Sequence, residues 1–226
     1  FVSRHGDYPE MFRALLSDAE ALPPGMAAPE FVDIQAHHGR FPRPDACDGY
    51  VITGSRHSVY DPLPWIPPLV DFVRGALAHR RRVVGICFGH QLIAHFFGGE
   101  TRAADVGWCV GVQEVEVTQA EPWMTPAAPQ LALLSSHKDQ VVRLPPGARL
   151  FARGERCPLA GFVLDDVLTF QGHPEFTNAY AGDLLDMREA LLGSDCYQRG
   201  KASLATSTDS RKVARWMLNF IGRAAP

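Results

Sequence analysis

The sequence predicts an α/β protein with three layers, in which helices cover both faces of a central sheet that is mixed but mostly parallel. Strand patterns and helix patterns alternate through the first hundred residues, as they do where crossover helices join parallel strands. Several of the expected strands are almost continuously apolar, which is typical of strands buried on both faces. A length of 226 residues fits one large domain, so we expect residues 1–226 to form a single domain.

The alternating part begins with a helix over residues 7–22, where Asp7 and Glu10 have the spacing of a capping box. The elements expected after it are strands over 30–36 and 47–53, a helix over 64–80, a strand over 82–86 and a helix over 89–97.

Strand patterns dominate the middle of the chain. Residues 110–117 alternate, but the apolar parity changes between Val112 and Val115, which predicts a β-bulge near Gln113. Shorter strands are expected over 131–135, 140–143, 148–153, 160–165 and 167–171. Helices over 178–192, with Leu191 and Leu192 facing inward, and over 209–222 are expected to close the chain on either side of a polar loop, 193–208.

The composition argues against several classes of protein. The net charge is -3 and the basic residues are scattered, so nothing points to nucleic acid or to an anionic membrane. No apolar run approaches the ~18–20 residues of a transmembrane helix, and the N-terminus lacks the apolar region of a signal peptide. Five widely spaced cysteines without a CxxC pair argue against a disulfide framework and a zinc ribbon. We therefore expect a reduced, cytoplasmic protein.

A cysteine stands between two glycines where a strand pattern passes into a helical one. Gly85-Ile86-Cys87-Phe88-Gly89 has the G-x-nucleophile-x-G form of a nucleophile elbow, a tight turn in which bulky neighbours would collide. The Phe88 amide would serve as one oxyanion donor, and the positive end of the following helix would favour the thiolate. A buried structural cysteine beside chance glycines would give the same letters, so the assignment depends on a base elsewhere in the chain.

The segment TFQGHPEF, residues 169–176, offers that base. A thiol with a reference pKa of ~8.5 needs a base to react efficiently at neutral pH. In an extended segment residues two apart face the same way, so Glu175 would orient the His173 imidazole and stabilise its cation. Pro174 keeps this stretch extended at a strand end. The sequence thus predicts a catalytic triad of Cys87, His173 and Glu175.

These motifs resemble those of the class I glutamine amidotransferases, whose triad is Cys, His and Glu in this order. GICFGHQL is followed by GHPEF, with His173 coming 86 residues after Cys87. GDYPEMF and the closing helix resemble the stand-alone branch of the family, which includes the plant γ-glutamyl peptidases. The resemblance covers nearly the whole chain and implies a class I glutamine amidotransferase-like fold.

Other segments carry the resemblance further. ITGSRHSVYD resembles the glycine loop that supplies the second oxyanion donor, which implies this role for Gly54. SSHKDQVVRLPPG resembles the SH-x-D-x-V-x-x-LP segment of the amidotransferase domain of GMP synthetases. In that family the segment helps to hold the α-amino and α-carboxylate ends of glutamine, which implies substrate contacts for Ser136 and His137. Gln91, one helical turn after Cys87, would contact substrate or else be solvated on the helix surface.

The chain departs from the family pattern at its start. The family's sheet begins with a strand before the GDYP helix, whereas Phe1 to His5 alone precede Gly6 here. We expect either that upstream residues supply this strand or that it is lost. The predicted catalytic residues are not affected.

The resemblance implies hydrolysis of a γ-glutamyl amide, either free glutamine or a γ-glutamyl compound. Cys87 would attack the side-chain carbonyl after His173 takes its proton, the amides of Gly54 and Phe88 would hold the oxyanion, and water would cleave the γ-glutamyl thioester. The sequence contains no P-loop and no histidine–carboxylate cluster with ligand spacing, so we expect no metal, no ATP and no other cofactor.

Alternatives stay open. A glutaminase subunit would supply ammonia to a separate synthetase, and a transferase would pass the γ-glutamyl group to another amine; we favour hydrolysis without an obligate partner. A non-catalytic scaffold or regulatory subunit would keep the fold without needing the triad. An α/β-hydrolase-like thiol esterase would need its acid well before the histidine in chain order, whereas Glu175 directly follows His173.

Overall fold

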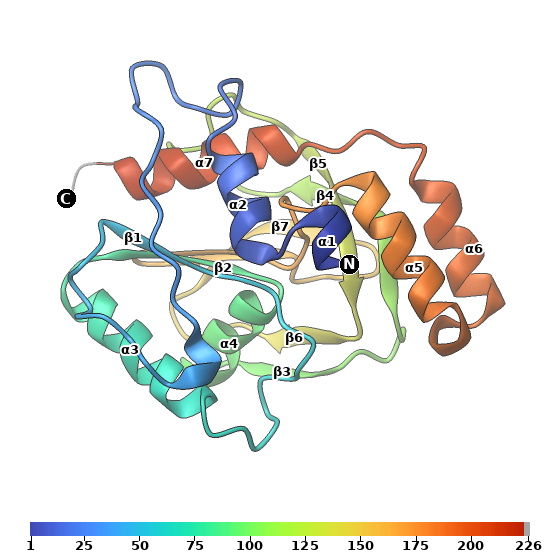
Figure 1. Cartoon of the computed structure of the whole chain (residues 1–226), viewed down its shortest axis with the longest axis horizontal. Helices are drawn as coiled ribbons and strands as arrows, with labels where there is room; N and C mark the ends of the chain where they lie inside the picture. Colours follow the sequence, from blue (N-terminus) through green and yellow to red (C-terminus); the bar gives the residue numbers. More distant parts are fainter. Residues whose placement is uncertain (224–226) are drawn as a thin grey trace.

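The computed structural model describes residues 1–223 and contains a seven-stranded mixed sheet that curls into a half-barrel (Figure 1). In spatial order its strands are β1 (Gly49–Ile52), β2 (Arg82–Ile86), β9 (Val167–Phe170), β8 (Gly161–Leu164), β7 (Arg149–Gly154), β4 (Cys109–Val117) and β5 (Gln130–His137). The first three strands run parallel, and every pairing from β9 onward is antiparallel. A separate antiparallel pair is formed by β3 (Glu100–Ala103) and β6 (Asp139–Arg143).

A single bridge brings the antiparallel half back to the centre of the sheet. Leu134 of β5 pairs with His173, which follows β9, and the His173 amide donates to the Leu134 carbonyl at 2.7 Å. The edge strand β5 therefore reaches the end of β9, a central strand. The expected three-layer α/β fold with a mixed sheet is confirmed, but the expectation that the sheet is mostly parallel is wrong, because only the pairings β1–β2 and β2–β9 are parallel and the other four are antiparallel.

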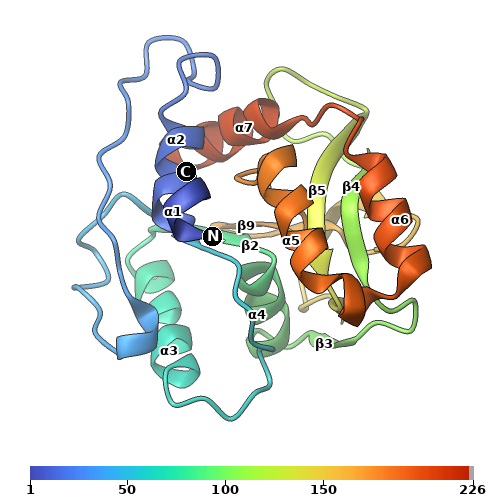
Figure 2. The same ribbon diagram turned by 45° about the vertical axis from the view of Figure 1, so that its right-hand side comes forward.

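Helices cover both faces of the sheet (Figures 1 and 2). One face carries α3 (Ile66–Ala78) and α4 (Phe88–Phe96), and the opposite face carries α2 (Tyr8–Leu16) and α7 (Ser210–Gly222). The helices α5 (Asn178–Leu192) and α6 (Ser194–Ser203) lie against β4 and β5. The short segments α1 (Val2–His5) and η1 (Ala36–His38) complete the described helices.

The predicted capping box of α2 and the predicted apolar stripe of α7 are both present in the structure. Asp7 and Glu10 form the expected capping box at the start of α2, with both reciprocal hydrogen bonds present. The apolar stripe of α7 is buried in one core cluster, where Trp216 donates its indole N–H to the Pro126 carbonyl at 2.9 Å. Hydrophobic periodicity is a strong signal in α7 because one face meets the sheet and the other meets solvent.

The strand expected over residues 30–36 is wrong. Residues 30–35 are not part of any strand, and β1 lies at the sheet edge with β2 as its partner. Phe31 and Ile34 pack against two different core clusters. Both side chains are half-buried and three positions apart, so the apolar letters of this segment come from packing under a loop that joins no β-ladder.

The β-bulge expected near Gln113 is also wrong. The ladder between β4 and β5 runs from Cys109 to Glu116 without a register shift. Gly111 has φ 75°, and the amide of Val112 donates to the Ser203 hydroxyl of α6 at 2.9 Å. Because α6 covers this end of β4, both of its faces are buried there, and the parity change reflects burial on both sides.

The polar loop expected over 193–208 contains helix α6. Gly193, at φ 75°, ends α5 and precedes the new helix. The buried residue of α6 is Gly200, which approaches Val110 and Leu185 so closely that a Cβ would lie 3.0 and 2.9 Å from their side chains. A helix that packs through a glycine has no apolar stripe to detect. Leu191 is exposed rather than inward, because the buried residues of α5 lie in its first half.

Candidate active site

Cys87 lies on the turn between β2 and α4 in a conformation that is rare for residues with a side chain, φ 50° and ψ -95°. Its amide donates to the Phe170 carbonyl of β9 at 2.9 Å. A Cβ at Gly85 would lie 2.7 Å from the Gly89 carbonyl oxygen, and one at Gly89 would lie 2.5 Å from the Ile52 carbonyl oxygen. Both glycines are therefore required by close backbone approach, as a nucleophile elbow demands.

The three parallel strands place the predicted catalytic segments at one edge of the sheet. Gly54 follows β1, Cys87 follows β2, and His173 follows β9. The carboxyl ends of parallel strands meet at the same edge, where α/β proteins commonly bind ligands. Residues that are far apart in sequence are thus brought together by strand order alone.

His173 and Glu175 form a buried pair. Their Nδ1 and Oε1 atoms are 2.7 Å apart, and the imidazole is also within hydrogen-bonding reach of the Cys87 side chain. Phe176 stacks on the His173 ring, with centroids 3.9 Å apart and an interplanar angle of 6°. The Glu175 carboxylate therefore orients the imidazole, the Phe176 ring covers its flat face, and the Cys87 side chain is close enough to influence the pKa of the ring.

The site is nearly closed to solvent: Cys87, His173 and Glu175 are 6%, 2% and 4% exposed. Burial disfavours the imidazolium, but the negative charges of Glu175 and Cys87, with hydrogen bonds to both side chains, outweigh it and raise the pKa of His173 to about 10. The second carboxylate oxygen, Oε2 of Glu175, has no hydrogen-bond partner within residues 1–223. The carboxylate thus pairs with the ring through Oε1 alone and stabilises a positive charge on it.

The two predicted oxyanion donors flank this line. Phe88 is the first residue of α4, so its amide has no acceptor within the helix's own ladder. Gly54 lies directly against the histidine: a Cβ there would be 2.7 Å from Cε1 of His173 and 3.2 Å from the hydroxyl of Tyr8. The glycine at position 54 lets its backbone approach the imidazole.

Gln91 is buried in the site rather than solvated on the helix surface. Its side-chain amide nitrogen donates to the Asp139 carbonyl at 2.8 Å and to Oε1 of Gln171 at 3.2 Å. Both amide hydrogens are therefore engaged within the protein. A direct contact of Gln91 with substrate, which stays a prediction, would use its carbonyl oxygen.

Ser136 and His137 project from opposite faces of β5, as neighbours on a strand must. Ser136 accepts a hydrogen bond from Nη1 of Arg188 at 2.7 Å. His137 is buried, and burial with the nearby His173 charge lowers its pKa to about 3, so the ring is neutral and donates from Nδ1 to the Asp139 carbonyl at 3.0 Å. A neutral His137 offers no cationic charge to a carboxylate, and its contact with substrate stays a prediction.

Sequence reasoning missed Tyr8 and Arg188. Tyr8 stacks near His173 with ring centroids 6.5 Å apart, and burial together with the charges of Glu175 and Cys87 raises its pKa. The Arg188 cation on α5 acts in the opposite direction on the pKa values of Tyr8 and Tyr180, and its guanidinium lies 5.5 Å from the centre of the Trp108 ring. Arg188 is therefore a cation outside the predicted triad that lies near Tyr8 and bonds to Ser136.

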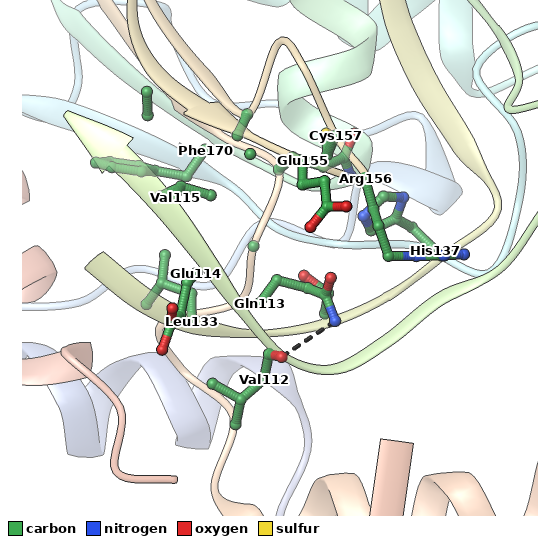
Figure 3. Close-up of a pocket in the computed structure, with 16 residues that line it drawn as sticks. Val112, Gln113, Glu114, Val115, Leu133, His137, Glu155, Arg156, Cys157 and Phe170 are labelled. Atoms are coloured by element: carbon green, nitrogen blue, oxygen red, sulfur yellow. Dashed lines mark hydrogen bonds between the residues drawn. The ribbon is translucent and has the colours of Figure 1, made fainter. Parts of the chain in front are cut away.

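A cavity of about 220 Å³ opens beside this cluster, inside the half-barrel. Figure 3 shows its lining from β4 (Val112 to Val115), from β5 (Leu133, His137) and from the loop Glu155 to Cys157. Gln113 bonds to the Val112 carbonyl at 3.1 Å in its wall. Cys87 and His173 are not among its lining residues, so this cavity is a neighbour of the predicted catalytic line and shares His137 and Gln171 with the surrounding polar network.

Within residues 1–223, no group of three or more His, Cys, Asp or Glu side chains is arranged to hold a metal ion. The same part of the chain has no helix with both the length and the apolar character needed to cross a membrane.

Comparisons with known proteins point to one family. The family model described as glutamine amidotransferase class-I matches residues 30–185. Gamma-glutamyl peptidase 4 of Arabidopsis thaliana is 30% identical over 233 residues, covering 97% of this chain and 89% of the relative. The glutamine-hydrolyzing GMP synthase subunit of Pyrococcus abyssi is 32% identical over 103 residues, which is 45% of this chain and 54% of the relative.

A solved structure gives the same result. The crystal structure of a glutamine amido transferase from Methylobacillus flagellatus matches with a TM-score of 0.63 and 27% identity over 76% of this chain and 77% of that chain. The mixed seven-stranded sheet, curled into a half-barrel and flanked by helices, matches the fold of class I glutamine amidotransferase-like structures. The chain belongs to the class I glutamine amidotransferase family.

Proposed function

We propose that this protein hydrolyses a γ-glutamyl amide bond through Cys87, His173 and Glu175, by way of a γ-glutamyl thioester. The observation that carries the proposal is the buried, hydrogen-bonded pair of His173 and Glu175 beside the elbow cysteine Cys87, at the carboxyl ends of β2 and β9. A nucleophile, a base and a group that orients the base are the three parts that covalent acyl transfer needs.

The residues divide the chemistry between them. His173 takes the thiol proton and Cys87 attacks the side-chain carbonyl carbon, while the amides of Gly54 and Phe88 bind the oxyanion. His173 then protonates the leaving nitrogen as the C–N bond breaks. Water, deprotonated by His173, cleaves the thioester and restores the thiol. Each oxyanion donor contributes roughly 2.7–4 kcal/mol to the stabilisation of the transition state.

The γ-glutamyl unit would present an α-carboxylate to the same site, and Arg188 is the cation available to receive it. Its guanidinium already contacts Ser136 and lies close enough to Tyr8 to influence its pKa. Guanidinium groups bind carboxylates through two parallel hydrogen bonds, which fixes orientation as well as charge. Ser136 would then position Arg188 rather than act alone.

The relatives bear on whether a partner is needed. The peptidase relative aligns over nearly the whole chain, whereas the GMP synthase relative aligns over less than half of it. This difference favours direct hydrolysis of γ-glutamyl compounds by the protein on its own. Ammonia supply to a separate synthetase is the second candidate, supported by the GMP synthase relative.

The proposal is tested by release of glutamate and of ammonia or amine from glutamine, glutathione and γ-glutamyl amines. We expect the purified protein to act on at least one member of the panel without any partner, and prior alkylation of its cysteines with iodoacetamide to abolish that release. Activity on glutamine that appears only after a synthetase is added would support the ammonia-supplying alternative. Turnover that survives complete alkylation would reject the thioester mechanism.

Replacing Arg188 with glutamine should raise KM for γ-glutamyl substrates by about 10- to 150-fold, the range expected for one charge-assisted hydrogen bond, with a smaller change in kcat. A matched substrate whose α-carboxylate is converted to a neutral amide tests this explanation. On that substrate the wild type and Arg188→Gln should have similar KM values. Arg74→Gln, on α3 and paired with Asp71, is the control. Equal losses on both substrates would show that Arg188 does not bind the carboxylate.

A further inference from the structure

The loop of residues 53–65 joins β1 to α3 and carries Gly54, yet it has no regular secondary structure. Several of its hydrogen bonds stay within the loop. The amide of His57 donates to the Ser55 hydroxyl at 3.2 Å, and the amide of Ser58 donates to the Asp61 carboxylate at 3.0 Å. Such bonds shape the loop but do not fix its distance from Cys87.

Asp139, the first residue of β6, connects this loop to the rest of the protein. Ser58 donates its hydroxyl to Oδ2 of Asp139 across 81 positions of sequence. Tyr60 approaches the same carboxylate: burial is the main reason that the pKa of its phenol is raised, and the Asp139 hydrogen bond and charge add to it. The Ser58 hydroxyl thus ties the loop to Asp139, and the Tyr60 phenol lies close enough to feel the charge of the same carboxylate.

The backbone of Asp139 is attached to the other side of the site. Its carbonyl accepts from the Gln91 side-chain amide at 2.8 Å and from the His137 ring at 3.0 Å. Gln91 lies one turn after Cys87 on α4, and its backbone amide donates to the Cys87 carbonyl at 3.0 Å. Asp139 therefore holds the elbow helix through its main chain and the glycine loop through its side chain.

We propose that Asp139 is a positioning residue that fixes the loop, and with it the Gly54 amide, in register with Cys87. This inference rests on the proposed function, in which Gly54 is an oxyanion donor. An oxyanion donor acts only within about 2.7–3.1 Å of the developing charge, so a loop that is displaced by a fraction of an ångström loses most of its effect. In this proposal the Asp139 carboxylate binds the loop through Ser58 and does not bind the α-amino group of the substrate.

The test compares Ser58→Ala, Asp139→Ala and the double variant, with Asp105→Ala as the control because Asp105 pairs with Arg102 on the surface. The substrates are γ-glutamyl-p-nitroanilide and glutaryl-p-nitroanilide, which lacks the α-amino group. We expect each single variant to lower kcat by about 10- to 100-fold on both substrates, a part of the 10²–10³-fold effect of losing an oxyanion donor. The double variant should be no slower than Asp139→Ala, because each single change already removes the same hydrogen bond between Ser58 and Asp139.

The rate at which iodoacetamide alkylates Cys87 provides a control, because a general loss of structure around the site would change this rate. This reaction displaces iodide at a saturated carbon and forms no oxyanion, so its rate should stay within about twofold of the wild-type rate in every variant. Unchanged kcat in the single variants, or losses that multiply in the double variant, would overturn the proposal. A rise in KM confined to the substrate with an α-amino group would assign Asp139 to substrate recognition and would also overturn it.

Hydrogen exchange separates this inference from the proposed function. In Ser58→Ala and Asp139→Ala we expect faster amide exchange at residues 54–58 than in the wild type, with exchange in β2 and β9 unchanged. This result does not depend on which substrate the enzyme uses. If the nitroanilides are not turned over but exchange accelerates as expected, the loop attachment stands and the proposed substrate class fails; unchanged exchange rejects the attachment.

Discussion

Replacing Cys87 with alanine should lower turnover of every γ-glutamyl substrate by a factor on the order of 10⁵ or more, because no other group can form the thioester. The fold should survive this change. The sulfur lies in a site held by backbone contacts at Gly85, Gly89 and Phe170, none of which involves the thiol. Glutamate release is the measurement, and circular dichroism establishes that the variant is folded.

Cys47→Ala is the matched control for this prediction. Cys47 is another free cysteine, partly buried, whose backbone amide donates to the Tyr50 hydroxyl at 3.3 Å. We expect its loss to leave turnover within about twofold of the wild type, as for substitutions away from the site. Comparable losses in the two variants would point to general cysteine-dependent damage, and full activity in Cys87→Ala would remove this residue from the mechanism.

The parts of the site that could be predicted from sequence are those whose residue types are dictated by local backbone geometry. Gly85 and Gly89 identify the elbow because no side chain fits there. The His-x-Glu spacing also predicts the pairing of His173 with Glu175, although Pro174 and Glu175 lie in a turn rather than in the expected extended stretch. These constraints are local, so short stretches of sequence contain them. The parallel order of β1, β2 and β9 then brings the segments to one edge.

Tyr8 and Arg188 could not be found in this way. Both reach the site from helices packed around the sheet, and neither is marked by a glycine, a proline or a motif spacing. Their positions near Gly54 and Ser136 depend on how α2 and α5 sit against the sheet, which is a long-range property. The bridge between Leu134 and His173 is of the same kind, because its partners come from separate strand regions.

Replacing Glu175 with glutamine should lower kcat/KM at neutral pH by about 10²- to 10⁴-fold, the upper figure being that for loss of the carboxylate in a serine protease triad. The amide is close in size to the carboxylate but carries no charge. Without that charge, burial becomes the dominant influence on His173, so the pKa of the imidazole should fall and the imidazolium should no longer be stabilised beside the sulfur.

The pH dependence distinguishes this explanation from simple loss of packing. An unassisted thiol ionises near its reference pKa of ~8.5, so the residual activity of Glu175→Gln should rise from neutral pH toward pH ~9, while wild-type activity changes little over that range. Glu189→Gln, an exposed change on α5, should follow the wild-type profile. Parallel profiles for wild type and Glu175→Gln would contradict the assigned role of the carboxylate.

The raised pKa of His173 should also make the free energy of unfolding depend on pH. The folded-state pKa of His173, about 10, lies above the unfolded value of about 6.5, so the charged imidazole stabilises the fold fully below about pH 6.5 and this contribution is lost as pH rises toward about 10. In Glu175→Gln this contribution is absent. Urea unfolding midpoints measured across that interval should therefore fall more steeply in the wild type than in the variant, because only the wild type must give up a stabilised imidazolium as its site loses the proton.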